Sequence, residues 1–157
     1  FLGVLLALPV AAVAMVLPYT DYFIPSIEEA QALTGLADMG GIARHFIDLG
    51  VKCCVFTLGG EGAYYHHADG TVFRIPAFDI AVKCTCGCGD CFNGGFATGL
   101  IKAVPMPEAI QIAQASSAQN ATGLGSQAGV KDYATTLAFI QGANHAAHRD
   151  RLVSSSV

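Results

Sequence analysis

Residues 84–96 read Cys-Thr-Cys-Gly-Cys-Gly-Asp-Cys-Phe-Asn-Gly-Gly-Phe, and this stretch decides the fold. Its first glycines precede Asp90, after which Phe92, Phe96 and Leu100 recur at helical spacing. The pattern predicts a loop that runs into the N-terminus of a helix. Free backbone N–H groups and the positive end of the helix dipole make such a start a binding site for an anion.

Asp90 stands where a carboxylate would repel a bound anion, so its position needs a reason. One interpretation is structural, because aspartate caps helix N-termini well. The other is catalytic, with the carboxylate taking the proton of a hydroxyl group that attacks phosphorus. The local pattern leaves both open, because a Gly-x-Gly-Asp string is short.

The segment from Thr85 to Asp90 resembles the second signature of the ribokinase-like (pfkB-type) sugar kinases, Asp-Thr-x-Gly-Ala-Gly-Asp. The resemblance implies that Asp90 is the catalytic base. It also implies an anion hole, formed by the backbone amides of Gly87, Cys88 and Gly89. The activity that it implies is a carbohydrate kinase that uses ATP and Mg²⁺, with a sugar or nucleoside as the phosphoryl acceptor.

Two further stretches resemble the family in the same chain order. Pro25-Ser26-Ile27-Glu28-Glu29-Ala30 is similar to its Pro-Asn-x-x-Glu-Ala segment, whose glutamate helps to organise magnesium and phosphate, a role that falls on Glu29. Ser26 and Glu29 also have the spacing of a capping box, which predicts a helix start there. The turn after an apolar strand over 51–58 resembles the nucleotide-binding turn, with these candidates for the edge of the ATP site: Thr57, Gly59, Gly60 and Gly62.

A helix that opens at Pro107 and the glycine loop after it are similar to the part of the family that borders the adenine and the monovalent-cation site. The resemblance gives as possible nucleotide contacts Gln114, Asn120, Gly123 and Gly125. Close packing explains small residues in this region equally well. Cys84 stands where the family usually has an Asp linked to the cation site, so activation by K⁺ is in doubt.

The fold class predicted from these patterns is α/β and ribokinase-like, with a mainly parallel sheet flanked by helices. An amphipathic helix over 40–50 precedes the strand, and residues 63–75 alternate around an Asp-Gly turn, which predicts a β-hairpin excursion. Further helices are expected over 90–103 and 131–141. Tight packing against a sheet would explain the glycines at 94, 95 and 99.

Composition limits the class of protein. The 157 residues are 53% hydrophobic and 13% charged, which predicts one well-buried domain over residues 1–157, with a frayed tail at 143–157. A net charge of −4 with 8 Lys plus Arg argues against nucleic-acid and anionic-membrane partners. The apolar start, Phe1–Leu17, is interrupted by Pro9 and lacks flanking basic residues, so we expect a buried strand or helix rather than a membrane segment.

The six cysteines lie in two short stretches, a distribution that suits a reducing cytoplasm. One alternative remains for four of them, because thiolates can close a zinc or iron–sulfur site: Cys84, Cys86, Cys88 and Cys91. The glycine spacing serves a phosphate better than a metal, which favours the kinase loop.

The absence of an initiator Met suggests that the chain is the latter part of something longer. The resemblance implies that this part is the nucleotide-binding and catalytic half of a kinase, and we expect the isolated chain to be inactive. Strands without their neighbours would favour association, so a homodimer is conceivable. Two rival functions stay open: a catalytically inactive remnant that binds nucleotide, and a metal-binding protein that uses the cysteine cluster.

Overall fold

The structure, a computed structural model, describes residue 13 and residues 15–151. Most of the apolar stretch Phe1–Leu17, for which a core element is predicted, lies outside the described residues. The chain divides into two compact units, 1–74 and 75–157, and each is described below by itself. That they form one domain stays a prediction.

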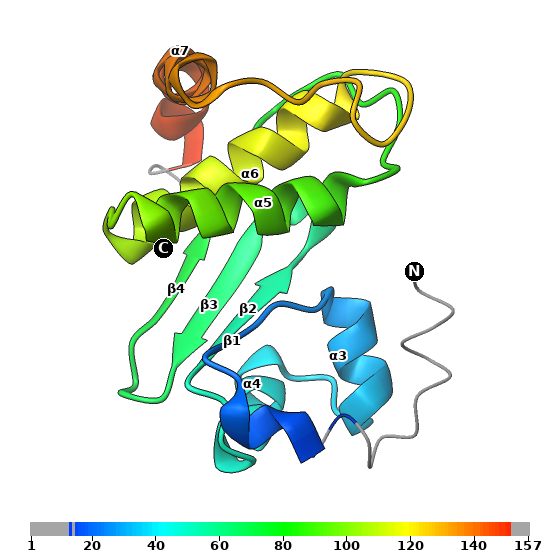
Figure 1. The fold of residues 1–157 in the computed structure, drawn as a ribbon, viewed down its shortest axis with the longest axis vertical. Helices are drawn as coiled ribbons and strands as arrows, with labels where there is room; N and C mark the ends of the chain where they lie inside the picture. Colours follow the sequence, from blue (N-terminus) through cyan, green and yellow to red (C-terminus); the bar gives the residue numbers. More distant parts are fainter. Residues whose placement is uncertain (1–12, 14, 152–157) are drawn as a thin grey trace. The chain divides into compact units, whose positions relative to one another are not determined.

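A four-stranded sheet of strand order β1-β2-β3-β4 forms the centre of the first unit (Figure 1). Its strands are β1 (Tyr22–Phe23), β2 (Cys53–Thr57), β3 (Ala63–His67) and β4 (Val72–Ile75), the last of which ends at the boundary between the units. The sheet is not mainly parallel in the described residues, because β1 pairs parallel to β2 whereas β2 pairs antiparallel to β3. Short turns join β2 to β3 and β3 to β4, and a connection this short can join only strands that run in opposite directions.

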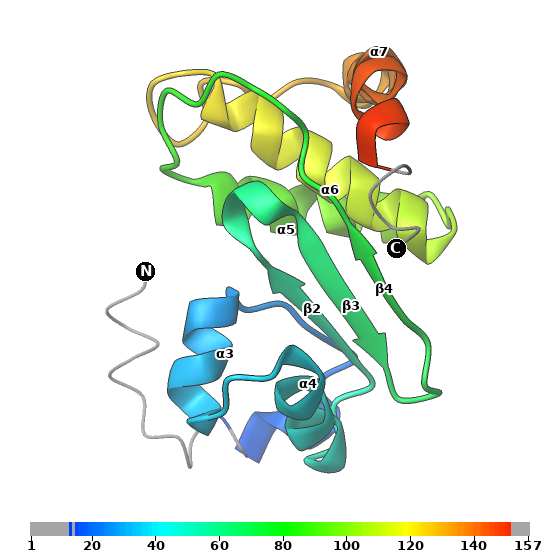
Figure 2. The ribbon, with the colours of Figure 1, turned by 180° about the vertical axis from the view of Figure 1, so that it is seen from behind.

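Two helices, α3 (Ile27–Thr34) and α4 (Met39–Asp48), pack against β2 in this unit (Figure 2). The predicted capping box begins α3: the Glu29 N–H donates to Ser26 Oγ at 3.2 Å, and the Ser26 N–H donates to Glu29 Oε2 at 2.8 Å. Helix α4 turns an apolar face inward. This face joins buried residues of α3, β2, β3 and the segments beside them in one core, which consists of Leu17, Ala30, Ile42, Ala43, Phe46, Val51, Cys54, Phe56 and Tyr64.

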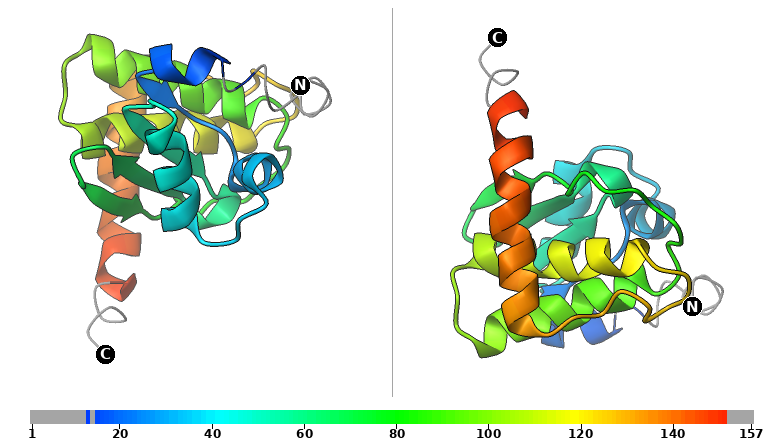
Figure 3. Two further views of the ribbon diagram at one scale, coloured as in Figure 1. Left: turned by 90° about the horizontal axis from the view of Figure 1, so that it is seen from below. Right: turned by 90° about the horizontal axis from the view of Figure 1, so that it is seen from above.

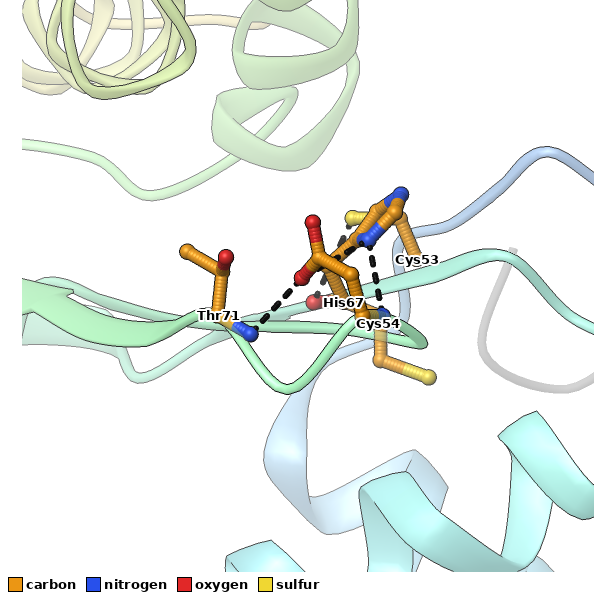
Figure 4. A network of polar contacts seen from close by, with 5 residues as sticks. Cys53, Cys54, His67 and Thr71 are labelled. Atoms are coloured by element: carbon orange, nitrogen blue, oxygen red, sulfur yellow. Dashed lines mark hydrogen bonds and ion pairs between the residues drawn. The ribbon is translucent and has the colours of Figure 1, made fainter.

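The predicted hairpin is confirmed as β3 and β4, and the turn between them is fixed by polar contacts (Figure 4). The Thr71 N–H donates to Asp69 Oδ1 at 2.8 Å, and the Asp69 N–H donates to His67 Nδ1 at 3.1 Å. The bonds from Thr71 hold the pKa of Asp69 below its usual value. Elsewhere in β3, the buried His66 lies with its Nδ1 3.0 Å from the Tyr64 hydroxyl.

The second unit consists of the helices α5 (Cys88–Ile101), α6 (Met106–Ala121) and α7 (Tyr133–Arg151). Helices α5 and α6 approach each other closely: a Cβ built on Gly95 would lie 2.8 Å from Ala113 Cα, and one on Gly99 would lie 2.7 Å from Ala109 Cα. The prediction that these glycines pack against a sheet is therefore wrong, because their neighbours belong to a helix. A Cβ built on Gly94, in contrast, would have no other atom within 4 Å.

Helix α7 is longer than expected (Figure 3). The sequence predicts a helix only to residue 141, but the helical backbone runs on to Arg151, so the first part of the predicted tail is helical. Ile140 of α7 packs with Ile112 and Ala115 of α6. Among the helices of the described residues, none has both the length and the apolar character that crossing a membrane requires.

Candidate active site

The loop that opens α5 depends on a glycine at its turning point. Gly87 is the N-cap of the helix and has a left-handed backbone, with φ of 73°. A Cβ at this position would also overlap the backbone of Ser126, since it would lie 2.8 Å from that residue's Cα. Both the conformation and the space therefore require glycine here.

The backbone N–H groups of this anion loop, which we define as residues 84–90, are partly free. In the described part of the chain, no acceptor is found for the N–H of Gly87, Gly89 or Asp90. The Cys88 N–H is predicted to be part of the anion hole, but in the structure it donates to the Thr85 carbonyl at 3.2 Å and closes the turn before the helix. The available donors are thus Gly87, Gly89 and Asp90, at the positive end of the α5 dipole.

Asp90 does not cap the helix. It is the third residue of α5, in its first turn, and no side chain makes a capping hydrogen bond at this N-terminus. Its exposed carboxyl group borders a pocket of about 620 Å³. The pocket is lined by Asp90, Cys91, Gly94, Gly95, Thr98, Ser116, Ser126, Gln127, Val130 and Lys131. A capping role for Asp90 therefore finds no support in the geometry, and its carboxylate is accessible to a reacting group.

Asn120 supports the anion loop from inside the unit. Its side chain is fully buried, and Nδ2 donates to the Cys86 carbonyl at 2.8 Å. The side chain has no access to solvent in this conformation, and a contact between Asn120 and the nucleotide stays a prediction. Its Oδ1 has no hydrogen-bond partner within the described residues.

The other predicted contacts of this unit also have structural neighbours. Gln114 is 6% exposed, and its Nε2 donates to the Ile75 carbonyl at 2.9 Å, so its nucleotide contact stays a prediction. Gly123 lies close to Ala128, where a Cβ would meet the Ala128 side chain at 2.6 Å. Gly125 is exposed and hydrogen bonds through its backbone to the Cys84 thiol.

In the first unit, the structure brings Glu29 and Thr57 to the same end of the sheet. Ser26, which shares the capping box with Glu29, forms a parallel bridge with Thr57, and the Thr57 N–H donates to the Pro25 carbonyl at 3.1 Å. The turn after β2 continues as a short 3-10 helix, Gly59–Glu61, and Gly59 and Gly60 are exposed with open space around them. Gly62 is buried and closes the turn through its carbonyl, which accepts from the Leu58 N–H at 2.8 Å.

The cysteines of the loop do not converge on one point. Cys88 Sγ lies 3.6 Å from the Ser117 carbonyl, and Cys91 Sγ lies 3.8 Å from the Ser126 carbonyl. In the part of the chain that the structure describes, no three His, Cys, Asp or Glu side chains are arranged to hold a metal ion.

Comparison with known proteins agrees with this geometry. Residues 4–132 match the pfkB family of carbohydrate kinases. The chain belongs to this family. It is 32% identical over 126 residues to ribokinase of Haemophilus influenzae, with 77% of this chain and 41% of the relative covered. It is 34% identical over 108 residues to 2-dehydro-3-deoxygluconokinase of Thermoproteus tenax, with 68% of this chain and 33% of the relative covered.

Solved structures of pfkB-type kinases have the same fold. Ribokinase from Thermotoga maritima superimposes with a TM-score of 0.77 at 28% identity, over 82% of this chain and 44% of that one. A ribokinase II from E. coli, solved in complex with ATP and Mg²⁺, gives a TM-score of 0.78 at 27% identity, over 84% of this chain and 42% of that one. The ribokinase-like fold class is confirmed. The chain spans about two fifths of the length of these relatives.

Sequence reasoning missed several residues of the pocket beside Asp90. Ser116, Ser126 and Lys131 line it together with Asp90, although they come from α6 and from the loop after it. No local motif marks them, because their proximity to Asp90 arises only when α5 packs on α6. The close approach at Gly95 and Gly99 was the available signal, since paired small residues allow two helices to come near.

Proposed function

We propose that the chain is the nucleotide-binding and catalytic part of an ATP-dependent kinase that transfers the γ-phosphoryl group to a hydroxyl of a sugar or nucleoside, with Asp90 as the general base. The observation that carries the proposal is the position of Asp90. Its carboxylate is exposed on a pocket, makes no capping bond, and lies on the same helical turn as free N–H groups. A base and an anion site side by side are what attack by a hydroxyl group on a phosphoryl group requires.

Each group in the anion loop has a distinct part in this proposal. The carboxylate of Asp90 accepts the proton of the acceptor hydroxyl as its oxygen approaches phosphorus. The N–H groups of Gly87, Gly89 and Asp90 donate to the oxygens of the transferred group, whose negative charge they stabilise together with the helix dipole. Thr57 and the exposed glycines 59 and 60 are the proposed edge of the nucleotide site.

Glu29 fits an indirect role toward magnesium. Its Oε2 accepts the Ser26 N–H, but a carboxylate has further acceptor capacity, and the side chain is only partly buried. It can therefore hold a water molecule of a hydrated Mg²⁺ while it still caps α3. The ion would supply charge neutralisation of the ATP phosphates. The neighbours named as kinases support this proposal, and one of them is described in complex with ATP and Mg²⁺.

The first test is binding. We expect calorimetry with Mg-ATP to give a measurable heat for this chain, and Asp90→Asn to bind at least as tightly, because it removes a negative charge beside the phosphates. Glu108, an acidic residue in the first turn of α6, provides the control variant Glu108→Gln. A folded sample that gives no heat and no thermal shift at millimolar ATP would refute the nucleotide site.

The second test is turnover in the complete enzyme. Asp90→Asn is expected to lower kcat by orders of magnitude with little change in ATP affinity, because the lost interaction belongs to the transition state. The 157-residue chain alone is expected to show little sugar-dependent ADP release, since most of the length of its relatives, including any acceptor-binding part, is not represented in it. Undiminished kcat in Asp90→Asn would exclude the base role and leave the nucleotide-binding remnant as the better proposal.

A further inference from the structure

Two cysteines of the anion loop, Cys84 and Cys86, interact directly and have no part in the proposed phosphoryl transfer. The Cys86 N–H donates to Cys84 Sγ at 3.4 Å, which holds the two residues side by side. Cys86 is exposed and Cys84 is partly exposed. The pair is therefore both preassembled and accessible to a small molecule from solvent.

The surroundings of Cys84 favour the thiolate form. Its sulfur accepts from the backbone N–H of Gly125 and from that of Cys86, and these bonds lower the pKa of Cys84 below its usual value. The Cys84 side chain raises the pKa of Cys86 in two ways: as a hydrogen-bond acceptor it favours the protonated thiol, and its negative charge disfavours a second one. One thiol of the pair is thus prepared as a nucleophile, and its neighbour stays protonated.

Three of the other cysteines have a raised thiol pKa instead. Cys53 and Cys54 are fully buried in β2, where burial raises the pKa of Cys53 to about 11 and that of Cys54 to about 12. Burial also raises the pKa of Cys91, whose thiol lies against the Ser126 carbonyl. Thiol reactivity depends on thiolate character and access, and Cys84 combines a lowered pKa with partial exposure beside the exposed Cys86.

We propose that Cys84 and Cys86 form a reactive dithiol that undergoes exchange with small-molecule disulfides such as oxidised glutathione, with Cys84 as the attacking residue and Cys86 as the resolving residue. The Cys84 thiolate attacks one sulfur of the small disulfide, forms a mixed disulfide and releases one thiolate. That thiolate takes the proton of the Cys86 thiol. The Cys86 thiolate then attacks the Cys84 sulfur, closes the Cys84–Cys86 disulfide and releases the second thiolate. The protein loses two electrons, and the small disulfide gains them.

The exchange has a consequence for the anion loop, and this part rests on the proposed function. A disulfide fixes the separation of the two Cβ atoms at roughly 3.5–4.5 Å. Closing it removes the bonds that the Cys84 thiolate accepts from Gly125 and Cys86, next to the Cys86 carbonyl that Asn120 holds. The turn at Gly87 follows directly, so oxidation is expected to disturb the N–H groups that are proposed to bind phosphate.

The experiment uses the full 157-residue chain, reduced and then exposed to oxidised glutathione, with samples trapped by acid and mapped by peptide mass spectrometry. The first product expected is a Cys84–Cys86 disulfide, seen as the loss of two hydrogens. In Cys86→Ser the mixed disulfide should accumulate on Cys84. In Cys84→Ser, glutathione incorporation at Cys86 should be about tenfold or more slower than incorporation at Cys84 in Cys86→Ser. The matched control Cys91→Ser should leave the Cys84–Cys86 product unchanged.

Two results would overturn the proposal. One is a first disulfide that involves Cys88 or Cys91, and the other is an oxidation rate that is the same in Cys84→Ser as in the native chain. The readout is covalent mass, so it does not depend on nucleotide binding. Absence of Mg-ATP binding in the reduced chain refutes the proposed function alone, and unchanged ATP binding after complete Cys84–Cys86 oxidation refutes the link to the anion loop.

Discussion

Adjacent glycines in α5 allow a matched test of how closely this helix packs on α6. Replacing either glycine by alanine in a helix interior gains up to about 1 kcal/mol of intrinsic helix propensity. Gly94 is exposed, and nothing lies within 4 Å of the position that a Cβ would take there, so Gly94→Ala should keep most of that gain. A Cβ on Gly95 would instead lie 2.7 Å from Ser116 Oγ and 2.8 Å from Ala113 Cα.

The magnitude follows from these distances. The Ala113 Cα is backbone and cannot rotate away, so the two helices must separate to admit the methyl group. Overpacking of this kind costs roughly 1–3 kcal/mol, which exceeds the gain in propensity. We therefore expect Gly94→Ala to raise the free energy of unfolding by about 0.4–1 kcal/mol and Gly95→Ala to leave it unchanged or lower it by up to about 2 kcal/mol.

Urea denaturation followed by far-UV circular dichroism at the helix band measures both variants, because the second unit consists of helices in its described part. A difference of 1 kcal/mol corresponds to about 2–4 °C in Tm for a chain of this size, so a thermal scan provides an independent check. Equal stabilisation by Gly94→Ala and Gly95→Ala would contradict the close packing of α5 on α6 and, with it, the shape of the pocket beside Asp90.

Two further predictions concern buried polar side chains. Asn120→Ala should lower the free energy of unfolding by about 1–3 kcal/mol, because the Cys86 carbonyl loses its donor. The control Asn93→Ala, on the exposed face of α5, should change the free energy of unfolding by less than about 0.5 kcal/mol. Equal effects of the two substitutions would contradict the supporting role of Asn120. Burial lowers the pKa of His66 from 6.5, so the unfolded chain takes up a proton more readily, and the free energy of unfolding should fall as the pH drops below 6.5. Denaturation at several pH values should show that this loss is smaller in His66→Gln and unchanged in His45→Gln, and a loss that persists in His66→Gln would exclude His66 as its source.

Local signals in the sequence were sufficient for the elements of the first unit. The Ser-x-x-Glu spacing predicted the start of α3 at Ser26 because both partners of a capping box lie within one turn. The Asp-Gly pair predicted the hairpin turn at 69–70 for a similar reason. The proportion of parallel pairing was not predictable in this way, since it depends on which strands meet rather than on the pattern within any one of them.

The roles of Gln114 and Asn120 could not be read from local patterns. Their amide groups donate to the carbonyls of Ile75 and Cys86, which lie 39 and 34 residues away in the chain. The resemblance of this chain to a family indicates which position corresponds to a ligand contact. It does not determine whether a side chain of different length at that position points toward a ligand or toward the interior. The interior positions arise here because each amide satisfies a backbone carbonyl.

The anion loop carries two proposed chemistries, which use different groups of the same loop. The proposed phosphate donors are backbone N–H groups, and their direction is set by the left-handed turn at Gly87 and by the bond from Asn120 to the Cys86 carbonyl. In the reduced state the turn at Gly87 makes no use of the side chains at 84 and 86, and Asn120 Nδ2 also donates to Cys88 Sγ at 3.8 Å. Cysteines can therefore occupy these positions, with the Cys88 thiol directed toward Ser117 and the other two in contact with each other. Under the two proposals, the reduced loop binds phosphate through its backbone, and the Cys84–Cys86 pair adds an oxidisable site to the same loop.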